Sequence, residues 1–391
     1  MKFGVYIHIP YCIQRCHYCD FTTFEQHSIM PPEEYLQLLL TEISLRSTKI
    51  SPQKLTSIYF GGGTPSLFPV NYIQKIINKL DACGLSLTPS TEVTIEINPT
   101  TIDKSKVDQY LEMGINRFSV GAQSFSDRLL KICGREHNAK QTIDTLNLLA
   151  EKHTNFSLDL LYGLPEQNLA QLKLDVRTAL QFHPQHVSAY CLTIPKAHPM
   201  NEGRPSEKSQ LKMLDTITEE LERYGLHQYE ISNFSRPGYE SQHNLLYWQD
   251  GAYWGLGLSA HSSFPFLYSG LRFWNPKDFS QYKNQVLSTS SNSLYPHESL
   301  PSSQFEKLQP WEALTDFCHI SLRLNSGLAK DALRYRFGDS VFELVKEKFY
   351  PLQTQELVVE NPHHWYLSEK GRKLSNKVFF TTTFLKEDFP H

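Results

Sequence analysis

Three cysteines near the start of the chain are the residues best suited to chemistry. Cys12, Cys16 and Cys19 follow a short apolar run and have C-x3-C-x2-C spacing. Three thiolates this close together can hold three irons of a [4Fe–4S] cluster, which leaves the fourth iron free to bind a small molecule. A structural zinc site is the alternative, and its fourth ligand would have to be His8, His17 or a distant residue. A disulfide does not suit an odd number of closely spaced cysteines.

The composition is that of an ordinary globular protein of two or three domains. The chain has 391 residues, 40% of them hydrophobic, and its formal net charge of −3 gives no electrostatic case for a nucleic-acid partner. Its seven cysteines show no pairing pattern, which favours a reducing compartment. The first residues do not resemble a signal peptide, and no apolar run reaches the ~18 residues of a membrane span. We therefore expect a cytoplasmic protein.

The elements that must position the cysteines form a repeating pattern up to about residue 195. Six short apolar runs alternate with stretches of helical periodicity, which predicts an α/β fold of parallel strands joined by right-handed crossovers. A closed eight-stranded barrel would need two more units. We therefore expect a partial, open (β/α)6 barrel of TIM-like design, with ligands at the carboxyl ends of its strands. The six expected strands are Phe3–Ile9, Ser57–Phe60, Glu92–Ile97, Arg117–Val120, Ser157–Tyr162 and His186–Leu192.

The rest of the chain predicts an extension and a small C-terminal domain. A long helix is expected from Glu207 to about Tyr224. The last part has helices followed by a hairpin of Leu357–Val359 and Trp365–Leu367, the order of a winged helix, but its twelve Lys/Arg balance twelve Asp/Glu, which argues against DNA binding. The expected divisions are a core at 1–200, an extension at 201–287, a Ser/Pro-rich linker at 288–304 and a C-terminal α+β domain at 305–391.

A glycine-rich turn follows the second expected strand. Gly62, Gly63 and Thr64 stand in the run G-G-G-T-P, where glycines either let the backbone approach a ligand or make a tight turn. The turn lacks the Gly-Lys-Ser/Thr ending of a phosphate-binding loop. Glu96 lies within the next apolar strand, and a carboxylate buried there needs either a ligand or a salt bridge.

Three more polar side chains lie in or after the later strands. Gln123 follows the fourth strand, Arg135 lies in a Gly-Arg-Glu-His run shortly after it, and Asp159 lies in the fifth strand. Each alone could be structural, since a half-buried strand also alternates polar and apolar residues. Together, an amide, a cation and a carboxylate at successive strand ends suit a zwitterionic nucleoside. Arginine matches the carboxylate of such a ligand better than lysine does.

The cysteine spacing resembles that of the radical S-adenosylmethionine (SAM) superfamily. With His8–Cys12, the glycine turn, the 116–123 run and Asp159–Pro165, the chain more closely resembles the oxygen-independent coproporphyrinogen III oxidases and their HemW-type relatives, over about residues 3–265. The resemblance implies a [4Fe–4S] cluster on the three cysteines and SAM on its open iron. It also implies that the glycine turn contacts the SAM amino group and that Glu96 contacts the SAM hydroxyls. The residues implied to contact SAM are Tyr6, Tyr18, Gly62, Gly63, Thr64, Glu96, Gln123, Arg135 and Asp159.

Two features separate the branches of this family. The oxidases carry a fourth cysteine two residues after the third, where this chain has Phe21. They also have a longer segment before the cluster, where this chain has only eleven residues before Cys12. Both differences point to the HemW-type branch, whose members are haem chaperones rather than oxidases. The resemblance then implies haem and an unknown acceptor haemoprotein as partners, and it leaves a homodimer and a transient membrane association open.

A histidine-aromatic element supports the same branch. His243, Tyr247 and Trp248 stand in His-Asn-Leu-Leu-Tyr-Trp, the H-N-x-x-Y-W element of HemW-type proteins. A histidine can supply its imidazole to haem iron, and aromatic side chains can offer flat faces to a porphyrin. Such a histidine, taken alone, is more often a packed core residue. Pro195 departs from the branch pattern, which has an acidic residue at this position.

The sequence therefore supports three hypotheses. The first is a cytoplasmic haem chaperone that carries a [4Fe–4S] cluster and SAM and binds haem near His243. The second is an oxygen-independent coproporphyrinogen III oxidase, because the residues for radical chemistry are all present. The third is a structural zinc protein. We prefer the first because of Phe21 and the H-N-x-x-Y-W element, and we expect no coproporphyrinogen dehydrogenase activity.

Overall fold

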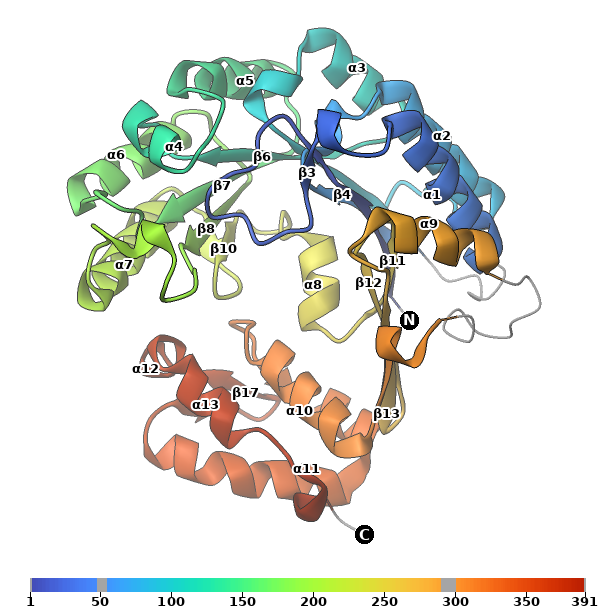
Figure 1. Cartoon of the computed structure of the whole chain (residues 1–391). Coiled ribbons are helices and arrows are strands. Elements are labelled where there is room, and N and C mark those ends of the chain that lie inside the picture. The colour runs from blue at the N-terminus through green and yellow to red at the C-terminus, as the bar shows by residue number, and fades with distance from the viewer. Residues whose placement is uncertain (1, 48–54, 290–299, 390–391) are drawn as a thin grey trace.

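The computed structural model describes residues 2–47, 55–289 and 300–389. Its centre is an arc of six parallel strands, each paired with the next along the arc, which confirms the predicted partial α/β barrel (Figure 1). These strands are largely buried, as parallel strands covered by helices must be. In spatial order they are β1 (Phe3–Ile9), β4 (Leu55–Gly62), β5 (Glu92–Ile97), β6 (Arg117–Gln123), β7 (Phe156–Tyr162) and β8 (His186–Cys191).

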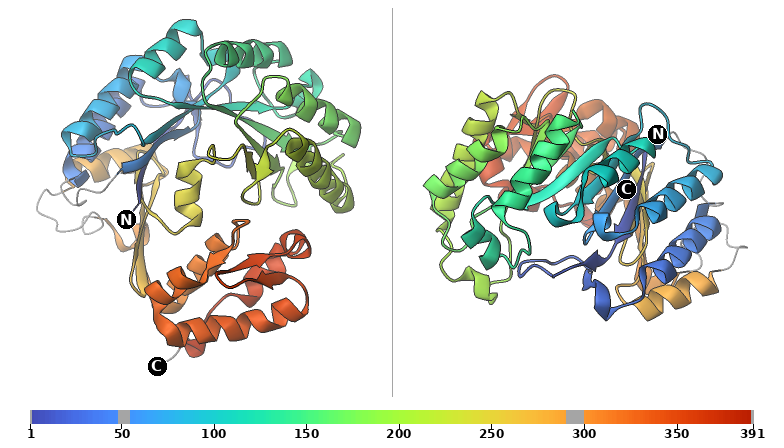
Figure 2. Two further views of the ribbon diagram at one scale, coloured as in Figure 1. Left: turned by 180° about the vertical axis from the view of Figure 1, so that it is seen from behind. Right: turned by 90° about the horizontal axis from the view of Figure 1, so that it is seen from above.

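Helices cover the outer side of the arc and leave its concave side free for a site (Figures 1 and 2). Their starts follow from local chemistry: the side chains of Asp103, Asn138 and Asn168 each accept a backbone N–H in the first turn of a helix. The predicted long helix after Glu207 is confirmed. The outer helices are α1 (Pro32–Ser47), α2 (Val70–Ala82), α3 (Lys104–Glu112), α4 (Asp127–Ile132), α5 (Ala139–Glu151), α6 (Leu169–Leu180) and α7 (Glu207–Arg223).

The sheet continues beyond both edges of the arc, which the sequence did not predict. One further strand pairs with β1 in parallel and three more follow it in antiparallel order, while two short antiparallel strands extend the other edge from β8. The described chain thus forms a mixed sheet of twelve strands. The added strands are β11 (Ala252–Leu256), β12 (His261–Phe266), β13 (Ser269–Trp274) and β14 (Phe305–Leu308) on one side, and β10 (Asn233–Ser235) and β9 (His227–Gln228) on the other.

Two short elements, the helix α8 (Gln242–Trp248) and the cysteine loop, lie on the concave side of the arc. The helix α8 lies inside the arc, against β4 and β1 (Figure 1). The cysteine loop begins with β2 (Tyr11–Cys12), which pairs with β3 (Phe24–Glu25) and so closes the loop on itself. On the outside, α9 (Phe279–Ser288) packs against α1.

The C-terminal part has its own hydrophobic core and lies below the open side of the arc (Figure 1). The predicted hairpin is present as an antiparallel pair, and helices precede it as expected. One long helix is kinked at Gly338, whose φ is 79°. The elements are α10 (Pro310–Ser321), β15 (Leu328–Ala329), α11 (Lys330–Thr354), β16 (Val358–Glu360), β17 (His364–Leu367), α12 (Glu369–Lys373) and α13 (Ser375–Thr381).

Two further expectations concern the linker and the absence of a membrane span. Most of the expected linker at 288–304 falls on residues 290–299, which lie outside the described part of the chain. Across the described ranges, the helices are all too short or too polar to cross a membrane.

Candidate functional site

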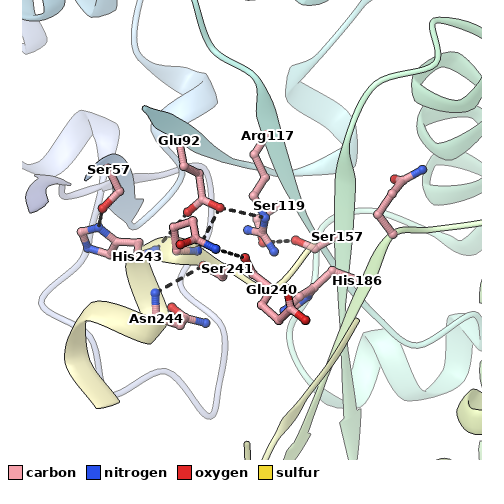
Figure 3. Close-up of polar contacts among 12 residues, drawn as sticks. Ser57, Glu92, Arg117, Ser119, Ser157, His186, Glu240, Ser241, His243 and Asn244 are labelled. Atoms are coloured by element: carbon pink, nitrogen blue, oxygen red, sulfur yellow. Dashed lines mark hydrogen bonds and ion pairs between the residues drawn. The ribbon is translucent and has the colours of Figure 1, made fainter. Parts of the chain in front are cut away.

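A cavity of about 410 Å³ opens on the concave side of the arc. Its mouth is formed by the cysteine loop and the carboxyl ends of the central strands, where an α/β sheet places its ligands. Its floor is formed by side chains from the starts of β6, β7 and β8 and from α8 (Figure 3). The cavity brings together most of the residues predicted from the sequence, namely Cys12, Cys16, Tyr18, Cys19, Gly62, Gly63, Thr64, Glu96, Gln123, Arg135 and Asp159.

The three cysteine thiols lie on one loop and are free of disulfides. Burial raises the pKa of Cys12 to about 11, so this thiol needs a metal or a nearby cation to become a thiolate. Nη1 of Arg135 lies 3.3 Å from Sγ of Cys16 and brings a positive charge to the loop. Within the described residues, no three His, Cys, Asp or Glu side chains converge closely enough to hold a single metal ion.

The glycine turn packs directly on the cysteine loop. The N–H of Gly63 donates to the carbonyl oxygen of Ile9 at 2.9 Å, and that of Thr64 donates to the carbonyl oxygen of Tyr11 at 2.7 Å. A Cβ at Gly63 would lie 2.6 Å from the Tyr11 carbonyl oxygen and 3.0 Å from Sγ of Cys12. Glycine is needed at this position because two backbone segments touch there.

Two half-buried carboxyl groups, those of Glu96 and Asp159, face the cavity from β5 and β7. Oε1 of Glu96 accepts a hydrogen bond from the Tyr59 hydroxyl at 2.8 Å, and Oε2 accepts one from the N–H of Gly62 at 3.1 Å. Burial raises the pKa of Glu96 to about 7 and that of Asp159 to about 6. Because both groups titrate near neutral pH, each can accept or donate a hydrogen bond to the hydroxyls of a nucleoside.

Arg135 and Gln123 lie near the end of β6. Nη2 of Arg135 donates a hydrogen bond to the carbonyl oxygen of Gly121 at 2.9 Å, which holds the guanidinium at the cavity mouth. Gln123 has a φ of 65° at a register shift between β6 and β7, and its side chain lines the cavity. The expected amide, cation and carboxyl groups are therefore neighbours in space.

The expected haem residues lie outside this cavity. His243 is 1% exposed, its Nδ1 lies 2.8 Å from Oγ of Ser57, and its Nε2 lies 2.8 Å from the Tyr247 hydroxyl. Burial lowers the pKa of the imidazole to about 3, so the ring is neutral. The ring of Trp248 packs against the guanidinium of Arg323, 4.4 Å from the ring centroid. In this conformation neither nitrogen of His243 is free to bind iron.

Tyr6 is not among the residues that line the first cavity. It lines a second cavity of about 280 Å³, together with Tyr247 and Tyr253, and its hydroxyl lies 3.1 Å from Nδ1 of His8. Phe21, whose exposed fraction is 65%, lines both cavities, so the two are neighbours. Tyr6 nevertheless lies on the concave face of β1, because its ring centroid is 6.2 Å from that of Tyr59 and 6.3 Å from that of His243, and a Cβ at Gly61 would meet both Tyr6 and Glu96.

Sequence reasoning did not single out the floor of the first cavity. Arg117, His186 and Asn244 line it, with the hydroxyls of Ser119 and Ser157 hydrogen-bonded to each other at 3.0 Å (Figure 3). The available signal was the alternation of Arg117, Ser119 and Gln123 on one face of a strand. Asn244 stands in the H-N-x-x-Y-W element, which was interpreted only for its histidine and aromatic residues, and His186 carried no signal in the sequence.

Comparisons with known proteins identify the family. Residues 6–179 match the Radical SAM superfamily, and residues 308–374 match the HemN C-terminal domain. The chain is 31% identical to the heme chaperone HemW of Bacillus subtilis over 384 residues, covering 96% of this chain and 98% of that protein. It is 32% identical to the heme chaperone HemW of Haemophilus influenzae over 394 residues, covering 98% of both. The chain belongs to the HemW family.

A solved structure shares the fold of this HemW-family chain. Coproporphyrinogen III oxidase (HemN) from Escherichia coli superposes with a TM-score of 0.80, covering 98% of this chain and 90% of that one, at 22% identity. At this identity the likeness shows the fold alone.

The radical SAM match implies an iron–sulfur cluster and SAM, and the residues fit both groups. Three free thiols share one loop at the mouth of the cavity, and a buried guanidinium lies beside them. The carboxyl groups of Glu96 and Asp159 and the amide of Gln123 surround the space next to the thiols. These are the donors and acceptors that a zwitterionic nucleoside requires.

Proposed function

We propose that this chain is a haem chaperone, which binds haem and transfers it to an acceptor haemoprotein in the cytoplasm. The observation that carries the proposal is the match, over almost the whole chain, to proteins named heme chaperone HemW. Phe21 supports it, because an exposed aromatic side chain stands where the resembling oxidases have a fourth cysteine.

The proposal includes two cofactors at the cavity mouth. Cys12, Cys16 and Cys19 would hold a [4Fe–4S] cluster, and Arg135 would pair with the carboxylate of SAM. Glu96 would accept the SAM hydroxyls, and the remaining residues implied by the resemblance would complete the contacts. When bound, the cluster supplies an open iron site and an electron.

The proposed haem site involves His243, Tyr247 and Trp248. For the His243 imidazole to bind iron, one of its two hydrogen bonds must break. Either Nε2 gives up its hydrogen bond to the Tyr247 hydroxyl, or Nδ1 gives up its hydrogen bond to Oγ of Ser57. Tyr247 lines the second cavity, so a ligand that enters there meets this hydrogen bond first. Haem binding is therefore expected to require a local rearrangement of α8.

The test uses the full chain after anaerobic reconstitution. Haem should bind the wild type, and iron content should fall in Cys16→Ser but not in Cys83→Ser, a cysteine at the end of α2. The same preparation is then assayed with reductant, SAM and coproporphyrinogen III. Failure to bind haem would remove the proposal, and sustained conversion to protoporphyrinogen IX would replace it with the oxidase hypothesis.

A further inference from the structure

Arg117 lies on the cavity floor without a hydrogen-bonding partner. It is the first residue of β6, its side chain is 3% exposed, and it lines the cavity. Its Nε lies 3.9 Å from Oε2 of Glu92, so the two groups form an ion pair that is too long for a hydrogen bond (Figure 3). Within residues 2–47, 55–289 and 300–389, no acceptor forms a hydrogen bond with this guanidinium. Its Nε is buried without a hydrogen-bonding partner, which is costly for a donor that has lost water, and its Nη groups keep their donors for an occupant of the cavity.

Glu92 does not depend on Arg117 for its own stabilisation. Its Oε2 accepts the N–H of Gln242 and its Oε1 accepts the N–H of His243, both at 3.0 Å (Figure 3). These two N–H groups stand at the start of α8, where the helix dipole favours a negative charge. The carboxylate of Glu92 is therefore satisfied by the helix, whereas the guanidinium of Arg117 is left with unused donors.

The floor around Arg117 is built for a polar occupant. An ordinary barrel fills its interior with branched apolar side chains, but here the neighbouring strands contribute Ser119 and Ser157. Asn244 closes the same space from α8, and His186 closes it from β8 (Figure 3). Burial, and then the charge of Arg117, lower the pKa of His186 well below its usual range, so this ring adds no charge. Hydroxyls and an amide beside a cation are partners for an anion.

Arg117 and Arg135 lie at opposite ends of one cavity, Arg117 on its floor and Arg135 at its mouth. Arg135 is held by the carbonyl oxygen of Gly121, which lies four residues after Arg117 and so about 13 Å further along β6. The cysteine loop shares the level of Arg135. A zwitterionic nucleoside at the mouth carries one carboxylate, and Arg135 lies there to pair with it. Arg117 then remains available to a second ligand.

We propose that the cavity floor is a second ligand site, in which the Arg117 guanidinium binds the carboxylate of an organic acid beside Ser119, Ser157 and Asn244. A free small acid and a propionate side chain of a tetrapyrrole present the same carboxylate. The first source is independent of haem transfer. The second rests on the proposed function.

The experiment titrates propionate, the smallest acid with this group, into the full chain with cluster reconstituted and SAM bound. Calorimetry compares the wild type with Arg117→Gln and with Arg177→Gln, which alters an arginine paired with Glu220 on the outer side of the sheet. Propionate should bind the wild type and Arg177→Gln in the millimolar range, and Arg117→Gln at least about tenfold more weakly. The affinity for SAM should be the same in all three proteins.

Three results would overturn the proposal. They are equal propionate affinity in Arg117→Gln and the wild type, no propionate binding to the wild type in the millimolar range, and a loss of SAM affinity in Arg117→Gln. If Arg117→Gln does not fold, the titration is repeated with Arg117→Lys. Lysine keeps the charge but cannot donate two parallel hydrogen bonds to a carboxylate, so this variant should also bind propionate more weakly than the wild type.

A second arm separates the two sources of the carboxylate. Haem and its dimethyl ester are titrated into the wild type and Arg117→Gln. If the tetrapyrrole is the source, the variant should bind haem more weakly, and the ester should bind both proteins alike. If a free acid is the source, Arg117→Gln should leave haem affinity unchanged. A chain that binds propionate but no haem would retain the floor site and lose the proposed function.

Discussion

The hydroxyl of Tyr247 lies 2.8 Å from Nε2 of His243, one turn earlier in the same helix. Ser57 of β4 holds the other ring nitrogen at the same distance. The imidazole therefore connects α8 to the sheet, and any iron that binds it must compete with one of these hydrogen bonds.

Removing the Tyr247 hydroxyl should make Nε2 of His243 available. We expect Tyr247→Phe to bind haem up to about tenfold more tightly, the value of one hydrogen bond. His243→Ala should bind haem more weakly and lose about 1–3 kcal/mol of unfolding free energy, because Ser57 and Tyr247 lose a buried partner. Absorbance titration and urea unfolding measure the two effects. Unchanged haem affinity in both variants would exclude His243 as the ligand.

Gly63 should be essential to the position of the cysteine loop. In Gly63→Ala the new Cβ would lie 2.6 Å from the Tyr11 carbonyl oxygen, so the loop must shift and iron content after reconstitution should fall. Gly84→Ala is the matched control, because its Cβ would meet nothing within 4 Å and only its φ of 85° is strained. The control should lose about 1 kcal/mol and retain its iron. Full iron content in Gly63→Ala would contradict this account.

The stability of the cofactor-free protein should fall between about pH 4.5 and pH 7. Glu96 has a pKa of about 7 in the folded protein, above its ordinary 4.5, so the folded state holds this proton more tightly than the unfolded chain. Its stabilising contribution is complete below pH 4.5 and is lost as the pH rises through 7, by at most about 3 kcal/mol.

Glu96→Gln should flatten that pH profile of the unfolding free energy. Asp159, whose pKa is raised to about 6, acts in the same direction, so part of the decline should remain in the variant. Urea unfolding at a series of pH values measures both profiles. Identical slopes for the two proteins would show that Glu96 is not protonated in the fold at neutral pH.

Arg336 should hold the C-terminal part to the sheet extension. Its Nη2 donates to the carbonyl oxygen of Ser269 at 2.9 Å, its Nε donates to that of Phe266 at 3.2 Å, and it pairs with Asp250. Arg336→Ala should cost about 3–5 kcal/mol, because Asp250 loses a buried partner. Hydrogen exchange should rise in α10 and α11. Lys346→Ala, which removes an exposed ion pair, should leave exchange there unaltered.

The site residues that could be predicted from the sequence either lie close together along the chain or belong to strands that the sequence pattern reveals. The cysteine loop and the glycine turn each lie within a few residues, and Glu96 and Asp159 belong to strands whose alternation is visible in the sequence. The edge strands β9, β10 and β14 were not predicted, because they are too short to show a period of their own.

The six parallel strands, the three cysteines and the family resemblance could all be predicted from the sequence, because strand periodicity and motif spacing are local properties of a chain. The contacts of His243 and Arg117 depend on tertiary packing, which gives the histidine two hydrogen bonds and leaves the arginine with an ion pair alone. Ser57 and His243 are 186 residues apart, and Glu92 and Gln242 are 150 apart, so no local pattern connects them. The start of the helix that carries the histidine also donates two N–H groups to Glu92, which leaves Arg117 with only a long ion pair to that carboxylate, and this arrangement exists only once α8 is packed inside the arc.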